Sequence, residues 1–414
     1  MGCESASRNA TAPESAFAPG SEGIDPAAFA GSHETDPRLS RTIPGFDAPF
    51  FQAGLAGYSD AAMRIVARRQ GCPVCVTEAL LDRTLLAGGK GFAKADLGEL
   101  HDNIPGGSED HPLVGQIMGS DPGEMAAAAI KMVEQGRRTP RAYRELRSSP
   151  ELHTETIADR TFAAIDVNLA CPVKKISKKA RGGHWLREPE GAIAILAAVR
   201  AAVPESIPCT VKLRRGSDDS PEAERNFYRI YDALHDLGYA WAVVHGRTVE
   251  QKYVGPSRWT FLRDLVRARP DHPVLGSGDV WSAHDIFRMI AYTGVSAVSV
   301  ARGCIGNPWV FRQAQQLMQG LQPLLPTIAE QREVLLQHFA ISVSINGERT
   351  AGLMMRKFGV RFSTHHPNAD EVRRAFIAVS SHDEWKAVID QHYTPLDAAN
   401  ASSIDPADTI PSSA

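Results

Sequence analysis

The chain has 414 residues, of which 43% are hydrophobic, and a formal net charge of −3. This length exceeds that of one small domain and suits a large α/β barrel with an additional domain. The slightly negative charge gives no global sign of a nucleic-acid-binding protein, so such a partner must meet a local basic patch. No apolar run is long enough to cross a bilayer, and the six scattered cysteines favour a reducing cytoplasm over a disulfide framework.

Both ends of the chain are predicted to be disordered. Residues 1–42 and 396–414 are rich in Ala, Ser, Pro, Gly and acidic residues, and they show no hydrophobic periodicity. Such a composition buries too little apolar surface to offset the entropy lost when a chain becomes ordered. We therefore expect the folded part to lie between these two segments.

Short apolar runs alternate with helical patterns over residues 43–318. A helical pattern follows six of the first seven predicted strands, all except the second, in one case behind the N-cap pair Asp121–Pro122. This alternation through eight strands predicts a TIM (β/α)8 barrel. The competing doubly wound sheet would require a glycine-rich dinucleotide loop, and no GxGxxG is present. The predicted strands cover residues 48–53, 73–77, 113–118, 163–167, 208–213, 240–244, 273–275 and 295–300.

Two segments depart from this alternation. Residues 136–160 form a polar, Arg-rich insertion, most simply a solvated loop at the bottom of the barrel, with an RNA-contacting arm as the alternative. Residues 319–395 show helical patterns without intervening strands, which predicts a small all-helical C-terminal domain. Its Arg356 and Lys357 belong to a basic group that suits either a polyanion or a solvated surface.

One predicted strand, residues 163–167, runs directly into a polar turn that carries Asn168 and Cys171. Because Pro172 disfavours the α conformation in the residue before it, Cys171 is expected at the end of the strand, where α/β folds place their chemistry. Taken alone, this thiol would more often be an ordinary buried cysteine. The lysines that follow it favour some thiolate character.

Polar side chains also end the other predicted strands. In a TIM barrel these ends open onto one face, so packing alone does not account for such a row. Burial of the Lys212 ammonium is unfavourable in free energy unless an anion or a polar ring system binds to it. A flat, polar, phosphorylated ligand fits this set, and FMN is the obvious one. The residues are Gln116, Asn168, Lys212, Arg214, His245, Arg247, Ser277, Asp279 and Arg302.

Cys72 and Cys75 suggest a metal site only weakly. Residues three apart on a strand point to opposite faces, and one pair supplies too few ligands for a structural zinc. We expect two core thiols and no metal.

The chain resembles tRNA-dihydrouridine synthases over residues 46–378. Seven motifs occur in the family's order, and Arg356-Lys357-Phe358 resembles the start of the family's tRNA-binding helical domain. The motifs are Ala56-Gly57-Tyr58-Ser59-Asp60, Gly115 to Ser120, Asp166 to Pro172, Val211 to Arg214, Val244 to Thr248, Gly278-Asp279, and Ala301-Arg302-Gly303 with Gly306 to Phe311.

The resemblance implies an FMN flavoprotein that uses NADPH to reduce particular tRNA uridines to 5,6-dihydrouridine. Flavin N5 would give the hydride, and Cys171 would give the proton as general acid. The implied cofactor contacts are Ala53, Gly54, Leu55, Gln116, Lys212, His245, Ser277, Gly278, Asp279, Ala301 and Arg302. The implied substrate contacts are Asn168, Lys174, Lys175, Arg214, Arg356 and Lys357. We expect a cytoplasmic monomer that binds no membrane.

Two alternatives remain open. An FMN barrel dehydrogenase acting on a free pyrimidine or a small enone would not need the helical domain and would turn over without RNA. A non-catalytic RNA-binding descendant of the fold would have lost Cys171 or the flavin-binding set, and this chain has kept both.

Overall fold

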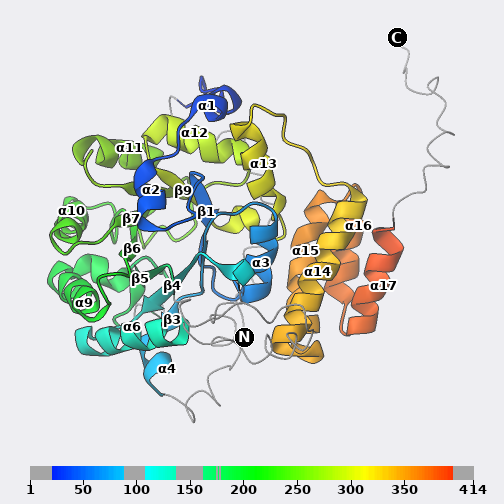
Figure 1. The fold of residues 1–414 in the computed structure, drawn as a ribbon, viewed down its shortest axis with the longest axis horizontal. Helices are drawn as coiled ribbons and strands as arrows, with labels where there is room; N and C mark the ends of the chain where they lie inside the picture. The colour runs from blue at the N-terminus through cyan, green and yellow to red at the C-terminus, as the bar shows by residue number, and fades with distance from the viewer. Residues whose placement is uncertain (1–20, 88–107, 137–161, 174–175, 177–178, 395–414) are drawn as a thin grey trace. The chain divides into compact units, whose positions relative to one another are not determined.

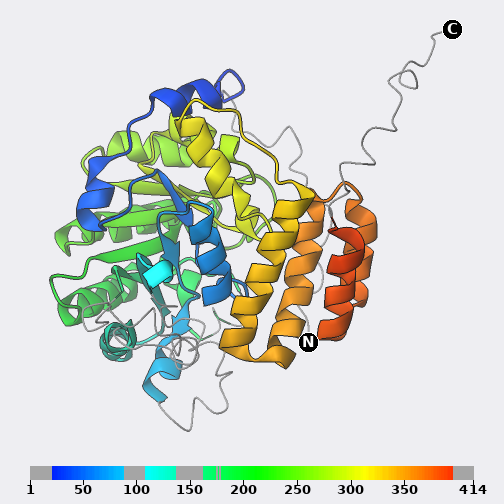
Figure 2. The ribbon, with the colours of Figure 1, turned by 45° about the vertical axis from the view of Figure 1, so that its right-hand side comes forward.

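A computed structural model of the chain describes residues 21–87, 108–136, 162–173, 176 and 179–394 (Figures 1 and 2). The chain divides into two compact units, residues 1–324 with 344–346, and residues 325–343 with 347–414. The sequence prediction places the boundary six residues earlier, at 319. Most of the predicted insertion at 136–160 and the predicted C-terminal tail lie outside the described residues.

The first unit is a closed barrel of eight parallel strands, so the predicted TIM barrel is confirmed. Pairing of β1 with both β2 and β9, and of β2 with β4, closes the ring. A short strand, β3 (Leu80–Leu81), pairs with β4 outside this ring and was not predicted. The barrel strands are β1 (Phe50–Gln52), β2 (Cys75–Val76), β4 (Leu113–Met118), β5 (Ala164–Asn168), β6 (Cys209–Arg214), β7 (Trp241–His245), β8 (Val274–Ser277) and β9 (Ala297–Val300).

Helices surround this barrel (Figure 1). Several begin at a side-chain cap: Asp60 accepts from the Met63 N–H, Ser220 accepts from the Ala223 N–H, and Ser282 forms a capping box with Asp285. The helix α4, which carries Asp82 at its start, was missed from the sequence. The helices are α3 (Ala61–Arg69), α4 (Asp82–Ala87), α6 (Pro122–Gly136), α9 (Pro189–Ala202), α10 (Pro221–Asp236), α11 (Trp259–Ala268), α12 (Ala283–Thr293) and α13 (Trp309–Met318).

The prediction of disorder up to residue 42 is wrong for its described part. Two helices, α1 (Pro26–Ser32) and α2 (Pro37–Thr42), begin behind Asp-Pro pairs whose aspartates accept backbone N–H groups. Leu39 of α2 is fully buried and joins a core cluster with the barrel residues Phe51 and Trp241. The segment is therefore ordered by tertiary packing that its own composition does not reveal.

The described part of the second unit contains helices and no strand. These are α14 (Ile328–Asn346), α15 (Glu348–Phe362), α16 (Ala369–Ala378) and α17 (His382–His392). Their shared core includes Phe358, Phe376 and Trp385, and the indole N–H of Trp385 donates to the Met355 carbonyl. None of the described helices is both long and apolar enough to cross a membrane.

Candidate active site at the carboxyl end of the barrel

The ends of neighbouring strands bring the predicted polar residues together. Asn168 pairs in register with Lys212, Arg214 with His245, and His245 with Ser277. Gln116 lies one strand further along and is bonded to Asn168 through its side chain. These residues therefore form one continuous rim at the carboxyl end of the barrel, where TIM barrels carry their active sites.

The side chain of Asn168 supports the turn that carries Cys171. Its Oδ1 accepts the backbone N–H groups of Ala170 (3.0 Å) and Cys171 (3.1 Å). Its Nδ2 donates to Gln116 Oε1 at 2.8 Å. The sequence prediction assigns Asn168 to the substrate, whereas in the structure its amide makes three hydrogen bonds within the protein. Asn168 thus positions the thiol.

Arg214 supports the same turn from the other side. Its Nε donates to the Ala170 carbonyl at 2.9 Å, and its Nη1 donates to the carbonyls of Thr248 and Lys252, both at 2.8 Å. The side chain is buried, although the sequence prediction assigns it to the substrate. Arg214 therefore ties the Cys171 turn to the loop that follows β7.

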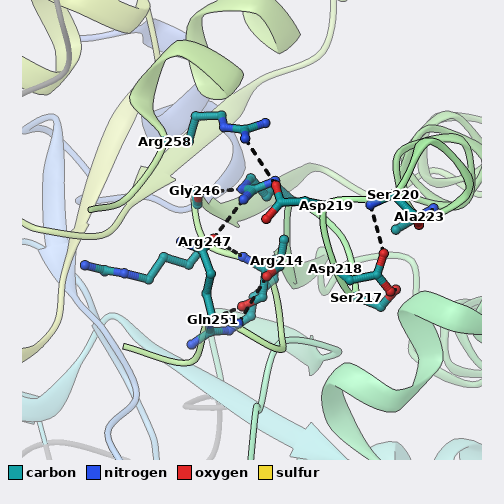
Figure 3. A network of polar contacts seen from close by, with 12 residues as sticks. Arg214, Ser217, Asp218, Asp219, Ser220, Ala223, Gly246, Arg247, Gln251 and Arg258 are labelled. Atoms are coloured by element: carbon teal, nitrogen blue, oxygen red, sulfur yellow. Dashed lines mark hydrogen bonds and ion pairs between the residues drawn. The ribbon is translucent and has the colours of Figure 1, made fainter. Parts of the chain in front are cut away.

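A second polar network, which includes Gly246, Gln251 and Asp219, joins the loops after β6 and β7 (Figure 3). Arg215 Nε donates to the Gly246 carbonyl (2.9 Å) and its Nη2 donates to Gln251 Oε1 (2.8 Å). Arg215 also pairs with Asp219 at 2.6 Å, and Asp219 pairs with Arg258 at 3.1 Å. These contacts hold the two loops as one structure beside the barrel opening.

The Cys171 thiol is partly exposed, and burial raises its pKa. A backbone hydrogen bond at Val173 and the positive charge of Arg214 oppose this shift without reversing it. The thiol is therefore protonated at neutral pH, which differs from the thiolate character that the lysine-rich loop suggests. Lys174 and Lys175 of that loop lie outside the described residues.

Two glycines and a buried ion pair hold the chain that follows this turn. The Gly183 N–H donates to the Cys171 carbonyl at 3.0 Å, and a Cβ at Gly182 would lie 2.8 Å from the Cys171 Cβ. Arg181 Nη2 pairs with Asp82 Oδ1 at 2.7 Å, with both side chains buried. Sequence reasoning missed this pair, because Asp82 stands 99 residues away at the start of the unpredicted α4.

Lys212 and His245 present complementary groups to the barrel opening. The Lys212 ammonium has no hydrogen-bond or ion-pair partner within the described part of the chain, and burial lowers its pKa to about 8. Burial and nearby cations hold the pKa of His245 well below 6.5, so its ring is neutral. Because the Arg247 backbone N–H donates to His245 Nδ1 (3.1 Å), the ring proton lies on Nε2. One cationic donor and one neutral donor therefore face the opening.

Asp166, which was not assigned a role from the sequence, lies below these groups. It accepts from Thr210 Oγ1 (2.6 Å) and Gln116 Nε2 (2.8 Å), and burial raises its pKa. Its bond to Gln116 fixes which end of that amide faces Asn168. A continuous hydrogen-bonded chain thus runs from Thr210 through Asp166 and Gln116 to the Cys171 turn.

The backbone of residues 53–55 approaches the same opening closely. The Ala53 N–H donates to the Val300 carbonyl at 2.9 Å, and the Leu55 N–H donates to Ser59 Oγ at 2.8 Å. A Cβ added at Gly54 would overlap the Thr77 carbonyl oxygen. Only glycine fits here, and it leaves a flat backbone surface beside Gln116.

The loops after β8 and β9 form a second, cationic end of the site. Gly278 and Asp279 both have positive φ (112° and 57°), and a Cβ at Gly278 would overlap Ser257 Oγ. Asp279 accepts from Arg247 Nη2 at 2.8 Å and from the Ser257 N–H at 2.7 Å, so it anchors this region internally. Arg302 approaches Asp279 at 3.7 Å.

Two buried polar atoms of this cationic end have no hydrogen-bond partner among the described residues. They are Arg247 Nη1 and Ser257 Oγ. Such groups are rarely left unsatisfied in a buried site unless a ligand or water meets them. Together with Arg302, the backbone of Ser277 and Ala301, and the glycine turn, they suit an anionic group.

Arg356 and Lys357 lie on α15 in the second unit. Arg356 is exposed, and the Lys357 ammonium lies 5.6 Å from the Phe358 ring centroid. The two predicted tRNA contacts are therefore neighbours on one helix of the second unit.

The Cys72 and Cys75 thiols lie 3.9 Å apart and are buried. The prediction that they point to opposite faces is wrong, because β2 begins only at Cys75 and the strand geometry does not extend to Cys72. No group of three potential metal ligands occurs in the part of the chain that the structure describes.

A profile of the family described as dihydrouridine synthase (Dus) matches residues 151–398. The chain is 31% identical to tRNA-dihydrouridine synthase B of Shewanella oneidensis over 76% of this chain and 83% of that protein. It is 29% identical to tRNA-dihydrouridine synthase B of Pseudomonas aeruginosa, covering 82% and 91%. A probable tRNA-dihydrouridine synthase of Synechocystis sp. is 28% identical, covering 82% and 85%.

Proposed function

Because this chain belongs to the dihydrouridine synthase family, we propose that it reduces particular uridines in tRNA to 5,6-dihydrouridine. In this proposal FMN is the cofactor and NADPH is the electron donor. The observation that carries this proposal is the Cys171 turn. Asn168 and Arg214 hold a protonated thiol at the rim of a barrel whose opening also contains the unpaired ammonium of Lys212.

The opening suits the ring system of a flavin. The backbone of residues 53–55 and the amide of Gln116 would line one side, and Lys212 and His245 would donate to the polar edge of the ring. A cationic donor near a carbonyl and ring nitrogen stabilises the negative charge that reduction places there. When bound, FMN supplies the hydride for the uracil double bond.

The cationic end of the site suits the phosphate of FMN. Ser277, Gly278 and Ala301 would offer backbone, and Arg302 and the unsatisfied Arg247 Nη1 would offer charged donors. Asp279 carries a negative charge and would act by holding Arg247 in place. This arrangement follows the general tendency of TIM barrels to bind phosphate beside the last two strands.

Cys171 would supply the proton in this reaction. Reduction of the uracil double bond needs a hydride at one carbon and a proton at its neighbour, and a positioned thiol is a competent general acid. Burial keeps Cys171 protonated until it donates. The guanidinium of Arg214, whose charge lowers the pKa of Cys171, would stabilise the thiolate that remains.

Recognition of tRNA would depend on local basic residues, because the net charge of the chain is −3. We assign this role to Lys174 and Lys175, which follow Cys171 closely in the sequence, and to Arg356 and Lys357 on α15. Affinity should then fall steeply with added salt. The target base must leave its stack to reach a barrel opening. We also place the enzyme in the cytoplasm as a monomer.

The test separates the two half-reactions. Cys171→Ala should accept electrons from NADPH normally, while uridine reduction falls by roughly 10²–10⁴-fold, the usual effect of removing a positioned general acid. Cys209→Ala, which removes a buried thiol at the opposite end of β6, is the control and should retain both rates. Full uridine reduction by Cys171→Ala would refute the assignment of the acid, and turnover of free uridine without tRNA would support the dehydrogenase alternative.

A further inference from the structure

Arg302 lies close to two aromatic side chains from different loops. The centre of its guanidinium is 4.9 Å from the ring centroid of Tyr253 and 4.7 Å from that of Trp281. Tyr253 belongs to the loop after β7, and Trp281 belongs to the loop after β8. Both distances fall within the range of cation–π contacts. We call Tyr253 and Trp281 the aromatic clamp.

Trp281 is held firmly by its surroundings. Its backbone N–H donates to Asp285 Oδ2 at 3.0 Å, as part of the cap that begins α12. A Cβ at Gly303 would overlap the Val280 carbonyl and lie 2.9 Å from the Trp281 Cα, so the turn after Arg302 packs directly against this backbone. The backbone that carries the Trp281 ring is therefore fixed by contacts that do not involve the Arg302 side chain.

Tyr253 belongs to a loop that is tied down on both sides. Arg214 Nη1 donates to the Lys252 carbonyl at 2.8 Å, and Arg247 Nε donates to the Gly255 carbonyl at 2.9 Å. Tyr253 itself is 57% exposed, and the Arg214 guanidinium also lies 5.6 Å from its ring centroid. A large aromatic side chain left this exposed on a fixed loop contributes little to the core, which leaves its contacts with the two arginines to explain its position.

We propose that the aromatic clamp positions Arg302 for the phosphate of FMN and so makes the site prefer FMN over riboflavin, an inference that rests on the proposed cofactor. Stacking uses the flat faces of a guanidinium and not its N–H groups, so a stacked arginine remains a bidentate phosphate donor. Arginine has many rotamers, and holding one of them before binding removes the entropy that binding would otherwise cost. Tyr253 and Trp281 are thus positioning residues that act through Arg302.

The experiment measures dissociation constants for FMN and riboflavin with the full-length protein freed of flavin. Trp281→Ala and Tyr253→Leu should each weaken FMN binding by about two- to fivefold, the loss expected from one partly exposed cation–π contact, while riboflavin binding stays unchanged. Trp281→Phe and Tyr253→Phe keep an aromatic ring and should bind FMN nearly as wild type does. Arg302→Ala should reduce the preference for FMN over riboflavin more than either ring substitution does.

The combined variants decide whether the clamp acts through Arg302. In an Arg302→Ala background, loss of either ring should leave FMN affinity unchanged. Equal weakening of FMN and riboflavin binding by Trp281→Ala, or full additivity with Arg302→Ala, would overturn the inference and leave the proposed function intact. Failure of the wild-type protein to bind either flavin would instead overturn the proposed cofactor itself.

Discussion

Replacement of Asn168 by alanine would test how the Cys171 turn is held. The substitution removes the acceptor for the Ala170 and Cys171 N–H groups and the donor to Gln116 Oε1. A buried group left without its partner costs about 1–3 kcal/mol. Because Asn168 is only half-buried, water can reach some of these groups, so we take the low end for each of the three. The expected loss of unfolding free energy is about 3 kcal/mol.

The functional effect should be confined to the step that uses the thiol. A displacement of about 1 Å at a reacting group can cost about 10²-fold in rate, so uridine reduction by Asn168→Ala should fall by about that factor. Electron transfer from NADPH should change much less, since it does not involve Cys171. Urea unfolding followed by fluorescence gives the stability, and stopped-flow absorbance gives the two rates.

Asn168→Asp provides the matched control. It keeps the oxygen that accepts the two backbone N–H groups but replaces the donor to Gln116 Oε1 with a charged acceptor. Its stability loss should therefore be at least about 1 kcal/mol, the net value of one hydrogen bond, while the Cys171 turn stays held. If Asn168→Ala were as stable as wild type and reduced uridine at the wild-type rate, the three hydrogen bonds would not be what positions Cys171.

Three other perturbations have distinct expected outcomes. Flavin affinity should fall by up to about tenfold per pH unit above the Lys212 pKa of about 8, because the charged form of Lys212 is lost there, and Lys212→Met should show no such fall in flavin titrations. Asp82→Ala should lower the free energy of unfolding by about 3–5 kcal/mol by leaving Arg181 charged and unpaired, and Asp82→Ala combined with Arg181→Met should lose less. Gly54→Ala should weaken flavin binding and cost about 1–3 kcal/mol in urea unfolding through its clash with the Thr77 carbonyl, whereas Gly23→Ala, with open space around it, should change neither.

The barrel and the place of its active site follow from the sequence. Apolar runs that alternate with helical patterns determine parallel strands with crossover helices, and parallel strands in a closed barrel must open their carboxyl ends together. Pro172 disfavours helix at Cys171, so the position of the thiol at the end of a strand was also determined locally. These features depend on residues that are close together in the sequence, so the sequence alone is enough to predict them.

Tertiary structure decided which polar groups at the opening hold one another. Asn168 and Arg214 look like substrate ligands in the sequence, but both are occupied by the turn that carries Cys171. The partner of Arg181 stands 99 residues away at Asp82, and α2 is ordered by burying Leu39 against barrel strands far along the chain. Side-chain partners of this kind are set by how distant segments pack, and hydrophobic periodicity carries no information about them.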